Sequence, residues 1–238
     1  MTMMENPILK DIEWASLLDT LASGYDGDYA RAMDDLDKYR PFEQKIQEGD
    51  PKPGKIIIDF LHKWHTQGVP NKSDKELTVR IKKNAKELDS LYYVSLHDVT
   101  SETVKRLFEG FSSPSIPGFG PTARTKTLHL LRPKTFVMWD EKIIGVFTER
   151  LKEKGKGDIK GSQMYVEFIK EMNKFSKNVL NDTTISSLNA LLKKLSKANE
   201  KRFYKKTEAK IIDEYNRLTK TRNAKVSFKL RTSDCIRL

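Results

Sequence analysis

The sequence is poor in cysteine. Cys235 is the only thiol among the 238 residues. A single cysteine excludes an intramolecular disulfide, a zinc site built from cysteines and a four-cysteine iron–sulfur cluster. The scarcity agrees with a reducing compartment, and we expect the protein to be cytoplasmic.

Long apolar runs are also missing. Runs such as Ile56-Ile57-Ile58 span only a few residues, whereas a membrane helix needs about 20. The first residues, MTMMENPILKDIEW, carry acids and no long apolar stretch, which is not the pattern of a secretory signal. We therefore expect no membrane partner.

The motifs that bind common cofactors are absent as well. There is no G-x-x-x-x-G-K-[ST] and no G-x-G-x-x-G, so we expect neither ATP nor a dinucleotide. His62 and His65 have the H-x-x-H spacing of a helical metal site, and Asp59 lies three residues earlier. No further ligand completes a tetrahedral set, so the sequence predicts no metal and no cofactor.

Charge is abundant and unevenly distributed. Charged residues make up 32% of the chain, and the net charge is +11. Residues 1–50 hold twelve acids and five bases, whereas residues 182–238 hold fifteen bases and six acids. This asymmetry is typical of a surface that faces a polyanion, most simply nucleic acid. A solvated, lysine-rich helical face is the alternative.

Apolar residues recur with helical spacing along most of the chain. This spacing predicts helices over 7–22, 28–48 with a break near Pro41, 53–67, 73–91, 101–110, 121–132, 141–153, 162–178, 182–197 and 199–221. Ser73 and Glu76 form a capping-box pattern at the start of one of them. Only VSFKL, 226–230, alternates like a strand. We expect an all-α fold, with a helical domain over 1–181 and a basic helical C-terminal extension over 182–238 packed on it.

The most informative stretch is 116–121, IPGFGP. Gly118 and Gly120 permit backbone angles that other residues avoid, and Pro121 suits the first position of a helix. The pattern predicts a tight hairpin between two helices, with free backbone N–H groups at the positive end of the second. Such an arrangement binds anions, and on nucleic acid it would hold a phosphate. A plain helix–helix connection uses the same residue types.

Three polar residues share one stripe of the helix that follows. Thr122, Lys126 and His129 are spaced i, i+4 and i+7, which predicts a common face distinct from the apolar one. A hydroxyl, an ammonium and an imidazole beside a phosphate-binding turn would form a polar wall of an active site. A solvated helix face is the alternative interpretation.

Asp140 lies between the apolar FVMW and the next predicted helix. Aspartate is a favoured N-cap, and the helix dipole and N–H groups keep a capping carboxylate ionised. The same carboxylate could stabilise an oxocarbenium ion or orient water against a sugar carbon, as cleavage of an N-glycosidic bond requires. Capping alone is the alternative, and it is the common role of such an aspartate.

The order of helix, IPGFGPTA hairpin, helix and aspartate resembles the helix-hairpin-helix DNA glycosylases, the HhH-GPD superfamily. Gly118 and Gly120 match the two glycines of the family hairpin. Asp140, twenty positions after Gly120, matches the family's catalytic aspartate. The resemblance is strong over about 30 residues around this segment and loose over 55–180.

The resemblance implies an enzyme that flips a modified or damaged base out of double-stranded DNA and hydrolyses its N-glycosidic bond. Members that also cleave the strand carry a lysine two residues after the second hairpin glycine, where this chain has Thr122. Lys126, one turn further on, is the candidate substitute. We therefore favour a monofunctional DNA glycosylase in which Asp140 and Lys126 are catalytic.

The stretch LHLLRPKTFVMWD is similar to one in uncharacterised prokaryotic proteins with such a hairpin. This similarity implies a divergent subfamily with an unusual modified base as substrate, such as a hypermodified phage base. Roles in DNA repair and in antiviral defence both fit. We expect the protein to act as a monomer.

Two groups of residues are predicted to contact the DNA. The expected backbone contacts are Pro117, Gly118, Phe119, Gly120, Thr122, Arg124 and His129. The candidates for stacking on the flipped base are Trp64, Tyr92, Tyr93 and Trp139, although large aromatic residues at helical spacing usually pack in a core. Two other functions remain open: a non-catalytic helix-hairpin-helix DNA- or RNA-binding protein, and a protein–protein adaptor.

Overall fold

The computed structural model describes residues 8–9, 11–12, 16, 25–64, 66, 68–112, 116–180, 182–198 and 205–222. Within these residues the regular elements are helical and there is no strand, which confirms the predicted all-α class. The elements are α2 (Tyr25–Asp37), α3 (Phe42–Lys45), α4 (Lys52–Lys63), η1 (Asn71–Ser73), α5 (Asp74–Lys83), α6 (Ala85–Ser90), α7 (Ser101–Gly110), α8 (Pro121–Leu131), α9 (Glu141–Glu153), α10 (Gly161–Val179), α11 (Asp182–Ala198) and α12 (Glu208–Arg222).

Several helix ends follow directly from local sequence. Thr100 caps α7 by accepting a hydrogen bond from the Thr103 N–H, and Asp140 caps α9 in the same way. Pro121 occupies the first turn of α8, where its missing N–H costs nothing. The chain breaks at Pro41 between α2 and α3, as predicted.

The predicted helix over 73–91 is divided. Asn84 ends α5, and α6 begins at the next residue. The expected capping box does not form, because the Ser73 side chain makes no cap hydrogen bond and Glu76 pairs with Arg80 at 3.0 Å. A Cβ on Gly110 would lie 2.4 Å from Asn84 Oδ1, so the end of α7 passes very close to this break.

Other predictions differ at the ends or fall outside the described residues. Helix α4 ends at Lys63, four residues before the expected end. Helix α12 begins at Glu208 rather than near 199, and residues 199–204 are not among those described. The predicted strand 226–230 and most of the predicted helix 7–22 also lie outside the described residues.

Helix α8 lies at the centre of the fold. It packs against α2, α4 and α7, and its residues from Thr125 to Leu131 are all buried. The sequence predicted a polar stripe along α8 through Lys126 and His129. That prediction is wrong, because neighbouring helices cover α8 on all sides after its first turn.

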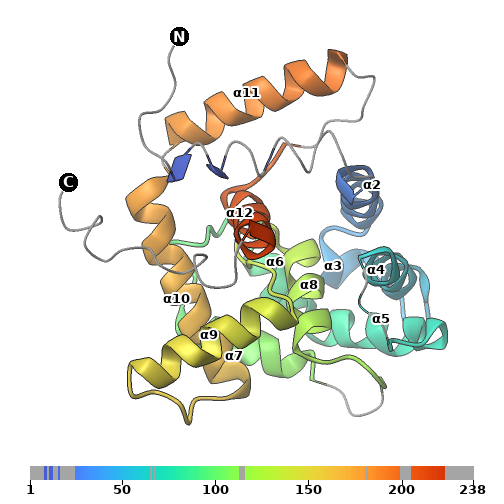
Figure 1. The fold of residues 1–238 in the computed structure, drawn as a ribbon. Helices are drawn as coiled ribbons and strands as arrows, with labels where there is room; N and C mark the ends of the chain where they lie inside the picture. The colour runs from blue at the N-terminus through green and yellow to red at the C-terminus, as the bar shows by residue number, and fades with distance from the viewer. Residues whose placement is uncertain are drawn as a thin grey trace.

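The described part of residues 182–238 is not a peripheral extension. Helix α12 packs against α9 and α10, and Figure 1 shows it in the middle of the molecule, with α11 along one side. Ala209, Ile211 and Ile212 are fully buried and belong to the same core as α8. The hydrophobic core therefore continues across the expected boundary at 181.

Part of the basic charge of this region is neutralised inside the protein. Lys206 and Lys210 are buried and lie 2.8 and 3.2 Å from Glu214 Oε1, which is also buried. Ser16 donates a hydrogen bond of 2.8 Å to the other oxygen of this carboxylate. The positive charge at the surface of this region is therefore smaller than the count of lysines and arginines along 182–238 indicates. None of the described helices is long and apolar enough to cross a membrane.

Candidate functional site

The hairpin that opens α8 is held by glycine-specific geometry. Gly118 has φ +71°, and a Cβ on it would lie 2.1 Å from the Gly68 carbonyl oxygen. The Phe119 N–H donates to the Ile116 carbonyl at 3.2 Å, and the Gly120 N–H donates to the Gly118 carbonyl at 2.9 Å. Phe119 is buried and anchors the turn, whereas Pro117 and Gly118 are exposed.

The first turn of α8 presents backbone donors at the end of this hairpin. Gly120 is the N-cap and supplies no capping side chain. The first intrahelical bond runs from the Arg124 N–H to the Gly120 carbonyl, at 3.1 Å. The N–H groups of Thr122 and Ala123 therefore precede the intrahelical ladder, and they lie at the positive end of the helix dipole. This geometry suits an anion such as a phosphate.

Arg124 reaches back over the same turn. Its Nε donates to the Phe119 carbonyl at 3.3 Å, and its guanidinium carbon lies 5.4 Å from the centre of the Phe108 ring. Partial burial lowers the pKa of Arg124. The side chain therefore stiffens the hairpin, and Thr122 remains partly exposed beside it.

Asp140 follows a residue, Trp139, that is held beside the second turn of α8. Its Oδ1 accepts a hydrogen bond of 2.9 Å from the Ile143 N–H, as the capping prediction required. The Thr125 hydroxyl is 3.3 Å from both the N and the O of Trp139. This bridge holds the segment before Asp140 against α8, and the half-buried carboxylate lies at the N-terminus of α9.

Lys126 does not lie on an open active-site wall. The side chain is buried, and Nζ donates to the Trp64 carbonyl at 2.7 Å and to Thr66 Oγ1 at 2.9 Å. The ammonium thus binds a carbonyl just beyond the last turn of α4, where a cation is favoured by the helix dipole. In this structure Lys126 joins α8 to α4.

His129 is also in the core. It is fully buried, with Nδ1 2.6 Å from the Phe136 carbonyl oxygen and Nε2 2.8 Å from the Tyr29 hydroxyl. Burial lowers its pKa to about 3, so the imidazole is neutral at physiological pH. The expected DNA contact through His129 is wrong, because the side chain is fully buried.

The four aromatic candidates for the base pocket do not converge. Trp139 is buried, with its ring centre 4.9 Å from that of Tyr165. Trp64 is also buried, with its ring centre 4.6 Å from that of Phe60. Tyr92 and Tyr93 are instead exposed, by 45% and 83%. The two tryptophans are therefore core residues, which is the ordinary role of large aromatics at helical spacing.

The residues considered for a metal are not gathered into a site. His62 Nε2 is 2.6 Å from the Val69 carbonyl oxygen, and His65 lies outside the described residues. No group of three or more His, Cys, Asp or Glu within the described part of the chain is placed to hold a metal ion.

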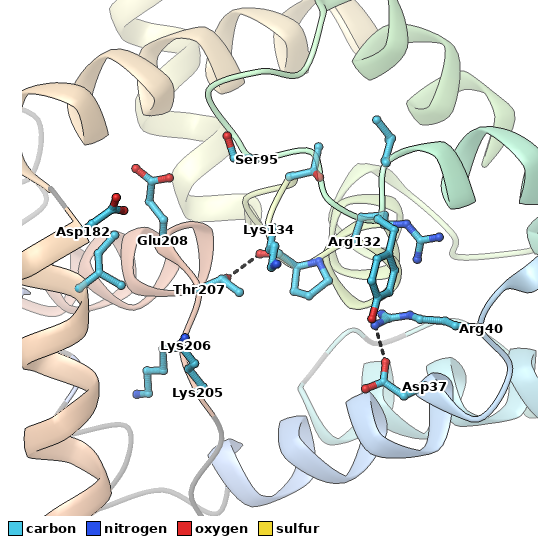
Figure 2. A pocket seen from close by; sticks show the side chains of 15 residues that line it. Asp37, Arg40, Ser95, Arg132, Lys134, Asp182, Lys205, Lys206, Thr207 and Glu208 are labelled. Atoms are coloured by element: carbon cyan, nitrogen blue, oxygen red, sulfur yellow. Dashed lines mark hydrogen bonds and ion pairs between the residues drawn. The ribbon is translucent and has the colours of Figure 1, made fainter.

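A second feature was not indicated by the sequence. A cavity of about 530 Å³ opens at the far end of α8, between the end of α2, the segments 91–95 and 132–135, and the starts of α11 and α12 (Figure 2). Its charged lining residues are Asp37, Arg40, Arg132, Lys134, Asp182, Lys205, Lys206 and Glu208. No local motif could have found it, because these residues come from five separate segments.

Comparison with known proteins adds no relative. No protein-family model, no curated protein and no solved structure matches this chain.

Proposed function

We propose that the protein is a monofunctional DNA glycosylase that uses a helix-hairpin-helix element to bind DNA and Asp140 to cleave an N-glycosidic bond. One observation carries the proposal. The Thr125 hydroxyl, in the second turn of α8, bridges to the backbone of Trp139 and so holds the residue before Asp140 beside the helix whose first turn presents the Thr122 and Ala123 N–H groups. A turn with backbone N–H donors and the segment that leads to Asp140 therefore lie beside each other, and this arrangement supports the proposal.

The division of labour follows from this geometry. The N–H groups at the start of α8 would hold a phosphate of the DNA backbone. The Asp140 carboxylate would stabilise positive charge on the sugar as the bond from C1′ to the base nitrogen breaks, with the bonding electrons leaving on the base. Water then adds to C1′ and loses a proton, and an abasic site remains.

Absence of strand cleavage is part of the proposal. A covalent mechanism needs an amine that can reach C1′ of the flipped nucleotide. Lys126 is buried and donates to the Trp64 carbonyl, and the position two residues after Gly120 is Thr122. We therefore remove Lys126 from the proposed catalytic residues and assign the role to Asp140 alone.

A non-catalytic DNA-binding protein is the second candidate, and one observation favours it. Asp140 accepts the Ile143 N–H hydrogen bond of an ordinary N-cap, and its neighbour Trp139 is buried in the core. A helix cap in this place requires no chemistry. The hairpin would bind a phosphate equally well in either case.

Release of free base from DNA separates the two candidates. The substrates are duplexes with oxidised, alkylated or deaminated bases and hypermodified phage DNA, each with and without alkali to cut abasic sites. Asp140→Asn removes the charge and retains a good N-cap, so its stability should stay within about 1 kcal/mol of the wild type. Glu141→Gln is the matched control, because Glu141 is the next residue, acidic and exposed.

We expect base release by the wild type and by Glu141→Gln, strand cuts only after alkali, and no release by Asp140→Asn. DNA binding by Asp140→Asn should persist and weaken steeply with salt, because phosphate contacts dominate it. Base release that survives in Asp140→Asn would refute the assigned role. No release from any duplex, with salt-sensitive binding by all three proteins, would establish the non-catalytic alternative.

A further inference from the structure

The cavity at the far end of α8 carries an inference that does not depend on the glycosylase proposal. Helix α8 has 11 residues, so its two ends are about 16 Å apart. The lining residues of the cavity include neither Asp140 nor any residue of the hairpin. Its volume of about 530 Å³ falls within the range of small-molecule sites.

Two lysines in the lining are available to an anion. Arg40 pairs with Asp37 and donates to the Leu130 and Leu131 carbonyls. Arg132 and Lys206 are buried and paired with acids. Lys134 and Lys205 are exposed, and within the described part of the chain neither takes part in an ion pair.

One wall of the cavity is aromatic. The guanidinium carbons of Arg40 and Arg132 each lie 5.9 Å from the centre of the Tyr92 ring. The Tyr93 ring lies 4.7 Å from the Tyr92 ring, edge to face, and 45% of Tyr92 remains exposed. An exposed aromatic ring beside cationic groups offers a surface on which a planar base can stack.

An acid completes the lining on the other side. Asp182 and Glu208 stand at the starts of α11 and α12, away from Arg40 and Arg132 (Figure 2). Glu208 is paired with His97 at 2.7 Å. Asp182 is exposed and has no ion-pair partner among the described residues. A carboxylate in this situation accepts hydrogen bonds from an exocyclic amino group of a base.

From this arrangement we propose that the cavity binds a nucleotide whose base carries an exocyclic amino group. Its phosphate contacts Lys134 and Lys205, its base stacks on Tyr92, and its amino group donates to Asp182. A simple anion would be repelled by Asp182 and Asp37, and a simple cation would be repelled by the two lysines. The ligand chemistry is the same for a free nucleotide and for a nucleotide unit of a DNA strand.

The test compares CMP with UMP. CMP carries an amino group at C4 where UMP has a carbonyl oxygen, and N3 is an acceptor in CMP and carries a proton in UMP. Isothermal titration measures their affinities for the full chain and for Lys134→Glu, Tyr92→Ala and Asp182→Asn. The matched control outside the cavity is Lys86→Glu, an exposed lysine of α6. Tyr93 is not suitable as a control, because its ring lies 4.7 Å from the Tyr92 ring, edge to face. Short oligodeoxycytidylate and oligothymidylate strands form the second arm, and inorganic phosphate is the competitor.

We expect CMP to bind more tightly than UMP, Lys134→Glu and Tyr92→Ala to weaken CMP by about tenfold or more, and Asp182→Asn to abolish the preference. The Lys86→Glu control should bind as the wild type does. If only the strands bind, they should show the same preference, for oligodeoxycytidylate, and the same variants should remove it. That result would support the proposal and identify a DNA strand as the ligand.

Three results would overturn it: no preference between the pyrimidines in either arm, an equal loss in Lys86→Glu, or competition by phosphate as strong as by CMP. Asp140→Asn, which is expected to end base release, should leave CMP affinity unchanged. A protein that binds CMP without releasing any base would therefore refute the proposed function and not this inference, and the reverse also holds.

Discussion

Replacing Gly118 by alanine should destabilise the protein far more than replacing Gly120, although both are glycines of the same hairpin. Gly118 has φ +71°, and an added Cβ would lie 2.1 Å from the Gly68 carbonyl oxygen and 2.3 Å from its carbon. Both neighbours are backbone atoms and cannot rotate away. Gly120 has φ −75°, and nothing lies within 4 Å of its added Cβ.

The magnitudes follow from these two environments. A left-handed backbone costs a non-glycine residue about 1–2 kcal/mol, and overpacking adds about 1–3 kcal/mol. Gly118→Ala should therefore lose about 2–5 kcal/mol, or about 4–20 °C in Tm for a chain of this size. For Gly120→Ala, the lower entropy of the unfolded chain and the weaker N-cap nearly cancel, and the change should stay within about 1 kcal/mol.

Urea unfolding followed by circular dichroism measures both variants against the wild type. Equal stability of Gly118→Ala and Gly120→Ala would refute the reasoning, because it would mean that the hairpin does not approach Gly68 as closely as the structure has it. A large loss in both would instead place a side chain or a ligand over Gly120.

Two further predictions concern the buried polar residues of α8. Lys126→Met should destabilise the protein by about 1–3 kcal/mol, because the buried Trp64 carbonyl loses the hydrogen bond from Lys126. In the wild type, borohydride should trap no covalent complex with abasic DNA. A trapped complex that disappears in Lys126→Met would contradict the structural role of this lysine. His129 has its pKa lowered from 6.5 to about 3 by burial, so its contribution to stability is present above pH 6.5 and is lost as the pH falls toward 3. Between pH 7.5 and 5.0 the wild type should lose about 2 kcal/mol more than His129→Asn in urea unfolding, and identical losses would show that His129 is accessible to protons in the folded state.

Sequence periodicity located helices well where a local signal ends them. Helix α9 coincides with the predicted 141–153, because Asp140 caps it and the apolar residues recur with regular spacing. The division at Asn84 was missed, because no glycine or proline marks it in the sequence, although the end of α7 at Gly110 lies against Asn84 in the fold. Capping by Asp140 was predictable, because a cap bonds only to residues of the next helical turn.

In the candidate site, too, the local features were predictable from the sequence and the burial of side chains was not. The turn residues Gly118 and Gly120 and the distance to Asp140 are readable in the sequence, and the structure places the hairpin and the aspartate on adjacent segments. The fate of Lys126 and His129 was not readable. A polar stripe on a helix is solvated when one face is open, and α8 is covered by α2, α4 and α7.

By itself the sequence determined the all-α class, most helix boundaries, the hairpin and the N-cap at Asp140, because each depends on interactions within a few residues. Only the tertiary structure decided that His129 is neutral in the core, that Lys126 binds the end of α4, and that α12 completes the core instead of forming a basic surface. It also brought five segments together around the cavity of Tyr92 and Lys134. Burial and convergence arise from contacts between distant parts of the chain, and no local pattern records them.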